Sequence, residues 1–226
     1  MHQKKPANKN GWLMGYLLLL AIHLLAILAD WELVRFITKP LLMAWLLVYF
    51  ISVTSPGLNN RVLVLAALFF SWLGDIFLMQ SAAGYFMAGL GAFFIAQLLY
   101  CWIFWRIRKQ NLQKENRNWP VLIGVVIYIT LLYGWLFQHL PSELKWPVFG
   151  YALAIGSMLI LAVHSATYPL HFTGRLLITG AGLFVVSDSL LAINQFVQPF
   201  ALASVAIMLT YGLAQLLIIH AIARIK

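Results

Sequence analysis

Eight apolar segments account for most of this 226-residue chain, and each is about as long as a helix that crosses a lipid bilayer. A spanning helix needs about 20 mostly apolar residues. Only 9% of the residues are charged, against about 25% in soluble domains. We therefore predict an all-α polytopic membrane protein that forms one integral membrane domain over residues 1–226. The expected spans are residues 11–29, 33–53, 62–78, 85–105, 119–137, 146–165, 176–194 and 200–223.

The first apolar segment could be mistaken for a secretory signal peptide, because Lys4, Lys5 and Lys9 precede it. The apolar region of a signal peptide is typically about 7–15 residues long, and the segment 11–29 is longer than that. We expect it to remain as the first membrane helix.

Basic residues collect on one side of the predicted bilayer. With the N-terminus inside, 12 of the 15 Lys and Arg residues fall on the cytoplasmic side, and only Arg35, Lys39 and Lys145 lie outside. Cytoplasmic loops of membrane proteins carry such an excess. The chain is therefore predicted to be a multi-pass protein, of a bacterial inner membrane, with both termini in the cytoplasm. The net charge of +9 reflects this asymmetry and does not indicate a nucleic-acid partner.

Asp75 and Asp188 are the only carboxylates inside the apolar segments. An ionisable group at membrane depth costs a few kcal/mol, so it usually faces a bundle interior or a wet cavity and marks function. Both aspartates lie about 20 Å along their spans, toward the outer half of the membrane. We expect them to share one polar site between two helices.

A weak internal repeat relates the two halves of the chain. Arg61 precedes Asp75 by 14 residues, Arg175 precedes Asp188 by 13, and an Ala-Gln-Leu-Leu sequence occurs at 96–99 and at 214–217. Because four spans separate the members of each pair, the halves would have the same orientation, as in a parallel repeat. The pattern suggests two four-helix halves, residues 11–105 and 119–223.

Two neighbouring carboxylates in a low-dielectric site repel each other, so that one holds a proton while the other is ionised. Such a pair can act as a general acid beside a general base. Lys39 enters from the outer end of its span and would favour the ionised forms, although an interfacial lysine that reaches the head groups is the simpler interpretation. For a single buried aspartate, interhelical hydrogen bonding would be as good an explanation as a functional role. A matched pair favours a functional role.

Further polar side chains at or near membrane depth are candidates for substrate contacts or for interhelical hydrogen bonds. They are Gln97, Ser187, Asn194, Tyr211 and Gln215. His23 is interpreted as a packing residue. The sequence contains no metal-binding His or Cys motif and no Gly-x-Ser-x-Gly elbow, so we expect no metal, no cofactor and no serine-hydrolase mechanism.

Five sequence blocks resemble the YhhN-type membrane family, whose characterised animal members are lysoplasmalogenases. The blocks occur in family order at 38–40 (TKP), 73–78 (LGDIFL), 89–100 (GLGAFFIAQLLY), 180–189 (GAGLFVVSDS) and 211–215 (YGLAQ). Each block is degenerate alone, and together they are fairly specific. Gln97 is a departure, because the resemblance leads us to expect histidine there.

The resemblance implies hydrolysis of the vinyl ether of a lysoplasmalogen to a fatty aldehyde and glycerophosphoethanolamine or glycerophosphocholine. Asp75 and Asp188 would be the catalytic pair, and Lys39 could hold the substrate phosphate as a point charge. The expected partners are thus a lysophospholipid substrate and membrane lipid. The alternatives are a proton-coupled transporter, because intramembrane carboxylates also form proton relays, and a lipid-binding membrane protein without turnover.

Overall fold

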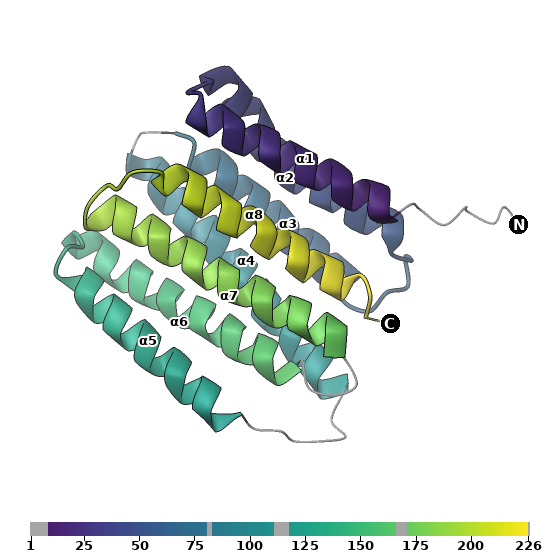
Figure 1. Ribbon diagram of the computed structural model, residues 1–226. Coiled ribbons are helices and arrows are strands. Elements are labelled where there is room, and N and C mark those ends of the chain that lie inside the picture. The colour runs from purple at the N-terminus through teal and green to yellow at the C-terminus, as the bar shows by residue number, and fades with distance from the viewer. Residues whose placement is uncertain (1–8, 81–82, 111–117, 166–170, 226) are drawn as a thin grey trace, which may run out of the picture.

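The protein is a bundle of helices that run up and down along a common direction (Figure 1). The structure is a computed structural model, and it describes residues 9–80, 83–110, 118–165 and 171–225. These residues contain eight helices and no strand. The helices are α1 (Lys9–Leu28), α2 (Glu32–Val53), α3 (Arg61–Phe77), α4 (Ala83–Gln110), α5 (Trp119–Phe137), α6 (Ser142–Ser165), α7 (His171–Phe196) and α8 (Ala203–Ile222).

Each predicted span corresponds to one helix, which confirms the all-α prediction. Seven of the helices are long and apolar enough to cross a membrane, as a multi-pass membrane protein requires. The exception is α3, whose 17 residues rise about 26 Å, near the lower limit for a spanning helix. The start of α1 and the end of α8 lie at the same end of the bundle (Figure 1). Which side of a membrane this end faces stays a prediction.

Several predicted boundaries were wrong, chiefly because polar residues extend the helices. The polar stretch expected to begin at Arg106 is helical through Gln110, since Arg and Lys are good helix formers and favour the last turn of a helix. Likewise, α6 begins at Ser142 and α7 at His171, both earlier than predicted. In contrast, α8 begins at Ala203, because Leu202 before it adopts a left-handed backbone conformation with φ 61°.

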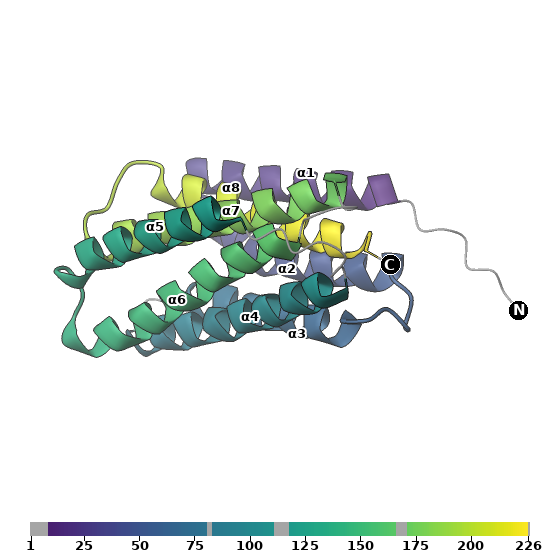
Figure 2. The ribbon, with the colours of Figure 1, turned by 90° about the horizontal axis from the view of Figure 1, so that it is seen from below.

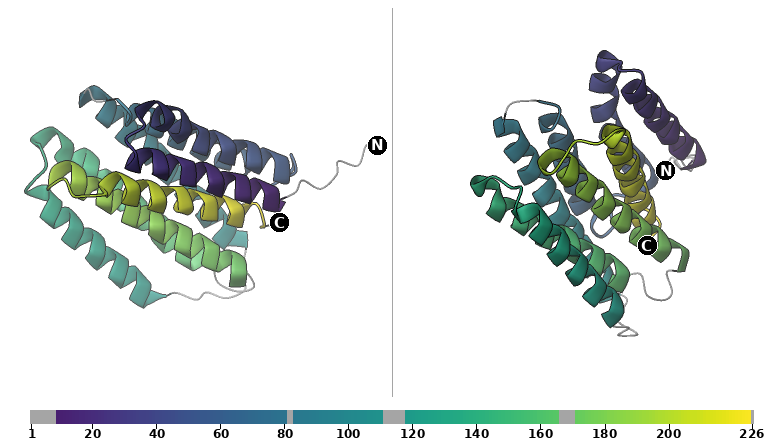
Figure 3. Two further views of the ribbon diagram at one scale, coloured as in Figure 1. Left: turned by 45° about the horizontal axis from the view of Figure 1, so that its top comes forward. Right: turned by 60° about the vertical axis from the view of Figure 1, so that its left-hand side comes forward.

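The helices form two layers, with α1, α8, α7 and α5 on one side and α2, α3, α4 and α6 on the other (Figure 2). Helices that follow one another in sequence pack together, apart from α4, which packs on α6 instead of on α5. Contacts of α8 with α1 and α2 join the first helices to the last (Figure 3). This packing does not by itself confirm a repeat of two four-helix halves, which stays a prediction.

Glycines bring the central helices unusually close together. A Cβ atom added to Gly74, the residue before Asp75, would lie 2.6 Å from the ring of Phe93 on α4. A Cβ atom on Gly180 would lie 3.0 Å from the carbonyl oxygen of Ala214 on α8. Small residues allow such close approach between membrane helices. The two helices that carry the aspartates, α3 and α7, are thereby held tightly against α4 and α8.

Candidate active site

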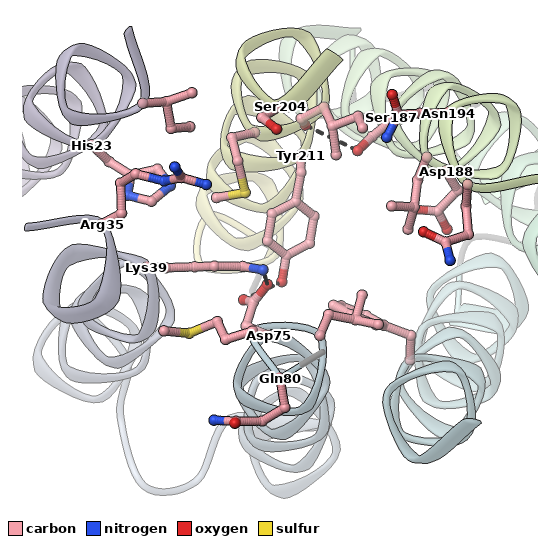
Figure 4. A pocket seen from close by; sticks show the side chains of 18 of the residues that line it. His23, Arg35, Lys39, Asp75, Gln80, Ser187, Asp188, Asn194, Ser204 and Tyr211 are labelled. Atoms are coloured by element: carbon pink, nitrogen blue, oxygen red, sulfur yellow. Dashed lines mark hydrogen bonds and ion pairs between the residues drawn. The ribbon is translucent and has the colours of Figure 1, made fainter. Parts of the chain in front are cut away.

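A cavity of about 730 Å³ lies between α1 and α2 on one side and α7 and α8 on the other, with α3 and α4 closing it (Figure 4). Its lining residues come from the N-terminal turns of α2, α4 and α8 and from the C-terminal turns of α1, α3 and α7. These turns meet at the end of the bundle opposite the two termini (Figure 1). Six of the residues singled out from the sequence line this cavity: Lys39, Asp75, Ser187, Asp188, Asn194 and Tyr211.

Asp75 is buried, with 3% of its surface exposed, and it has two polar partners from different helices. Its Oδ1 atom lies 4.0 Å from Nζ of Lys39 on α2. Its Oδ2 atom accepts a hydrogen bond of 2.9 Å from the hydroxyl of Tyr211 on α8. Lys39 is thus the counter-ion of this carboxylate, so the interpretation of Lys39 as an ordinary interfacial lysine was wrong.

The ring of Tyr211 is held by two perpendicular aromatic contacts, which fix the direction of its hydroxyl. The ring centroids of Phe93 and Phe184 lie 5.8 and 5.5 Å from that of Tyr211, with interplanar angles of 88° in both cases. Edge-to-face pairs of this kind are favourable beyond the area that they bury. Packing therefore directs the hydroxyl at Asp75 before any ligand binds.

Asp188 has a different environment. The hydroxyl of Tyr151 on α6 donates a hydrogen bond to its Oδ2 atom. Among the residues that the structure describes, no cation forms an ion pair with it. Two small cavities of about 60 and 50 Å³ adjoin it, and both are lined mainly by apolar side chains. Asp188 thus stands where the polar cavity meets the apolar interior.

Ser187 and Asn194 line the cavity but also make structural hydrogen bonds. The Ser187 hydroxyl donates to the carbonyl of Ile207, 3.0 Å away, and so connects α7 to α8. The Asn194 Oδ1 atom accepts from the backbone N–H of Phe200 at 3.4 Å, within the connection between the same two helices. Both side chains hold the site together, whether or not they also contact a ligand.

The two glutamines do not line the cavity, so the structure does not bring them together with the other predicted ligand contacts. Gln215 is fully buried, donates to the Ser71 hydroxyl at 3.0 Å and accepts from the Tyr100 hydroxyl at 2.7 Å. Because Ser71 and Asp75 lie one turn apart on α3, as Tyr211 and Gln215 do on α8, the two helices are joined by two successive hydrogen bonds. Gln215 therefore joins helices.

Gln97 is also fully buried. Neither of its amide atoms makes a hydrogen bond with the described residues, although it interacts with the nearby hydroxyl of Tyr151. Gln97 thus lies behind Tyr151 and could influence Asp188 only through that side chain.

Three functional candidates were missed in the sequence: Arg35, Tyr151 and His23. Arg35 lines the cavity one turn before Lys39, and Tyr151 contacts Asp188. The i, i+4 spacing of Arg35 and Lys39 on one helix was a usable signal, whereas a tyrosine within an apolar span carries none.

His23 lines the cavity as well, so packing is only part of its role. The Thr38 hydroxyl donates its proton to the Val34 carbonyl at 2.6 Å, so the 2.7 Å contact between His23 and Thr38 must use a proton on Nδ1 of the ring. The Nε2 atom is then the acceptor of a neutral ring, and it has no partner among the described residues.

The arrangement is suited to proton transfer. Two carboxyl groups line one cavity and interact electrostatically, each with a tyrosine hydroxyl as donor and only one with a lysine. Among the described residues, no group of three or more His, Cys, Asp or Glu side chains could hold a metal ion. Such a pair can give a proton to one atom of a substrate and remove a proton from water beside it.

Comparison with known proteins gives a consistent set of relatives. The model of the YhhN family matches residues 34–222. A lysoplasmalogenase TMEM86B from Sus scrofa is 35% identical over 173 residues, which cover 76% of this chain and 68% of the relative. The protein of the same name from Homo sapiens is 34% identical over 75% of this chain and 67% of its own.

A relative with a related name is also similar to this chain. A lysoplasmalogenase TMEM86A from Bos taurus is 30% identical over 158 residues, 69% of this chain and 62% of the relative. No solved structure matches the chain. The matched family region includes every residue of the cavity described here except those from α1 and the first residues of α2. Because the family model matches residues 34–222 and the structure is a helical membrane bundle, the chain belongs to the YhhN family.

Proposed function

We propose that this protein is a lysoplasmalogenase, which hydrolyses the vinyl ether bond of lysoplasmalogens within the membrane. The observation that carries the proposal is the pair of carboxyl groups, Asp75 and Asp188, on one cavity of a chain whose relatives are named lysoplasmalogenases. The products are a fatty aldehyde and glycerophosphoethanolamine or glycerophosphocholine. Lysophospholipids reach the cavity from the surrounding bilayer. The cavity lies at the end of the bundle opposite the termini, so if the termini are cytoplasmic it lies at the level of the outer leaflet.

The chemistry needs an acid and a base on opposite sides of a polarised double bond. One aspartic acid gives its proton to the alkenyl carbon farther from the ether oxygen, and the π electrons form the new C–H bond. The oxygen lone pair stabilises the resulting oxocarbenium ion. The other aspartate takes a proton from water as the water oxygen bonds to the carbon attached to the ether oxygen, which yields a hemiacetal. Glycoside hydrolysis also divides acid and base work between paired carboxyl groups around an oxocarbenium-like transition state, although there the acid protonates oxygen and not carbon.

The hemiacetal then breaks down with the two carboxyl groups in exchanged protonation states. The protonated aspartic acid gives its proton to the glycerol oxygen as the C–O bond breaks. The hemiacetal hydroxyl loses its proton to the other aspartate as the aldehyde forms. One water has been added and both carboxyl groups have returned to their starting states, so the cycle needs no cofactor.

The test is to incubate the purified protein in nanodiscs with an alkenyl lysophosphatidylethanolamine. We expect aldehyde and glycerophosphoethanolamine in equal amounts. In D₂O, protonation at carbon places one deuterium on the carbon next to the aldehyde. The matched controls are an alkyl ether and an acyl ester of the same chain length, neither of which should be cleaved.

Absence of aldehyde from the alkenyl substrate would remove the proposal. Proton flux across liposomes without aldehyde release would favour the proton-coupled transporter instead, since buried carboxylates also serve as proton relays.

A further inference from the structure

Arg35 is the most available cation of the cavity. It lies one turn before Lys39 on α2, about 6 Å nearer the end of the bundle, and lines the same cavity. Figure 4 shows both side chains extending from α2 into the cavity. Lys39 already pairs with Asp75. Within the described part of the chain, Arg35 forms one ion pair, a contact of 3.9 Å with Asp30, whose side chain is 91% exposed. Such a surface pair is weak, so the guanidinium can exchange Asp30 for a ligand.

Other polar groups gather at this end of the cavity. The Nε2 atom of His23 is buried and has no partner among the described residues, which is the condition of an atom that awaits a ligand. Glu32 lines the cavity close to Arg35, at i and i+3 on the same helix. A guanidinium suits a phosphate, and a carboxylate suits an ammonium group. The α2 end of the cavity therefore has the chemistry of a zwitterionic phospholipid head group.

Apolar space adjoins the Asp188 end of the cavity. The cavities of about 60 and 50 Å³ beside Asp188 are lined by side chains of α3 to α7, among them Leu90, Val148 and Ala192. Val148, Asp188 and Ala192 line both, so the two spaces adjoin each other. A hydrocarbon chain gains by leaving water for such surroundings.

We propose that Arg35 binds the phosphate of a zwitterionic lysophospholipid, whose hydrocarbon chain runs from Asp188 toward the two apolar cavities, one between α4, α6 and α7 and the other between α5, α6 and α7. This inference rests on the proposed function. The order Arg35, Asp75, Asp188, apolar cavity along the site matches the order phosphate, ether-bearing carbon, outer alkenyl carbon, chain along the substrate.

The orientation assigns the two aspartates. The outer alkenyl carbon lies at Asp188, which faces no described cation and therefore keeps the proton that it gives to carbon. The carbon attached to the ether oxygen lies at Asp75, which Lys39 holds as the carboxylate and which takes the proton of the attacking water. Tyr151 and Tyr211 position the two carboxyl groups and do not exchange protons with the substrate.

The decisive experiment compares two substrates with the same alkenyl chain, one a glycerophosphoethanolamine and the other a plain glycerol without phosphate. Arg35→Gln should raise KM for the phosphorylated substrate about 10- to 100-fold, as expected for loss of a charge-assisted contact, and leave kcat for that substrate unchanged. The KM and kcat for the alkenyl glycerol without phosphate should not change. Arg35→Lys should give an intermediate KM. Equal KM changes for both substrates, or none, would refute the phosphate site.

Two matched controls separate phosphate binding from a structural effect. Asp30→Asn breaks the same ion pair but keeps the guanidinium, so it should behave like wild type. Lys145→Gln removes a cation at the same end of the bundle that lies over the ring of Phe137 and does not line the cavity, and it should also leave KM unchanged. A KM increase for Asp30→Asn equal to that for Arg35→Gln would make Arg35 a structural residue.

Binding without turnover makes the inference independent of the proposed activity. A saturated alkyl ether lysophosphatidylethanolamine should bind wild type tightly and Arg35→Gln about 10- to 100-fold more weakly, whether or not alkenyl substrates are cleaved. If wild type binds this lipid through Arg35 but releases no aldehyde, the proposed function fails and the phosphate site stands. If aldehyde is released and Arg35 variants bind as wild type, the phosphate site fails alone. Competition by inorganic phosphate at the lipid's own concentration would point to free phosphate and contradict a lipid subsite.

A separate variant tests the direction in which the hydrocarbon chain of the substrate runs. Ala192→Leu fills the space shared by the two apolar cavities, so it should lower kcat/KM for long alkenyl chains more than for short ones. The effect of Arg35→Gln on the phosphorylated substrate should persist in the double mutant. Equal losses for long and short chains would place the hydrocarbon chain elsewhere.

Discussion

The two aspartates look alike in sequence but occupy different environments. Asp75 pairs with Lys39 and lies on the polar side of the cavity, whereas Asp188 has a tyrosine as its hydrogen-bond partner and borders apolar space. In a low-dielectric site, a neighbouring cation decides which of two carboxyl groups carries the charge. Matched sequence contexts can thus lead to unequal environments when the surrounding helices differ.

The largest expected effects come from the aspartates themselves. Asp75→Asn and Asp188→Asn should each reduce aldehyde release by about 10²–10⁴-fold, because asparagine keeps the size but cannot transfer the proton. The double mutant should lose far less than the product of the single losses, since both groups serve one cycle. Initial rates and thermal melting of purified variants would measure this. Stable asparagine variants with wild-type rates would exclude the two-aspartate mechanism.

Lys39→Met should affect Asp75 strongly and Asp188 little. Removing one partner of a buried ion pair costs about 3–5 kcal/mol unless the remaining carboxyl group takes up a proton, which would also remove the base. We expect lower stability and at least a tenfold loss of turnover. Adding Asp75→Asn should restore much of the stability, whereas adding Asp188→Asn should not. Equal coupling to both aspartates, measured by unfolding in detergent, would contradict the asymmetry.

Substitutions of the two tyrosines test the difference between Asp75 and Asp188 with smaller expected effects. Tyr211→Phe and Tyr151→Phe each delete one hydroxyl that donates to one carboxyl group. Each should reduce kcat about tenfold, the effect of a hydrogen bond to a charged group, because Asp75 is charged and Asp188 becomes charged as it gives up its proton. Tyr211→Phe should be coupled to Asp75→Asn, and Tyr151→Phe to Asp188→Asn. Double-mutant cycles on kcat measure this coupling, and additive effects within either pair would show that the tyrosine does not act through its aspartate.

The smallest effects are expected for the two glutamines, whose substitutions should change stability by different amounts. Gln215→Leu deletes contacts to Ser71 and Tyr100 and should cost about 1–2 kcal/mol of stability, the upper range for polar contacts between membrane helices. Gln97→Leu removes an amide that makes no hydrogen bond with the described residues, so stability should stay the same or rise slightly. Turnover by the folded fraction should change little in both. A large rise in KM for either variant would instead support the predicted substrate contact.

The sequence by itself determined the eight helices and predicted that the two aspartates face one polar site, as their shared cavity shows. Long apolar runs must become helices in a bilayer, because only internal hydrogen bonds satisfy their backbones there. A carboxyl group within such a run must find a polar cavity or a partner. Tyr211 and Gln215 lie four residues apart on α8 and therefore share a face, which the structure shows turned toward α3.

Only the tertiary structure decided which residues meet. The spacing of residues along a helix gives the face that they share but not the helix that this face contacts. The contacts of Tyr211 with Asp75 and of Gln215 with Ser71 join α8 to α3, two helices that are distant in sequence. Gln97 and Gln215 look equivalent in sequence. Among the described residues, however, packing gives Gln215 two hydrogen bonds and Gln97 none. These differences arise because close-packed interiors respond to the shape of every neighbour, which no single segment of the chain specifies.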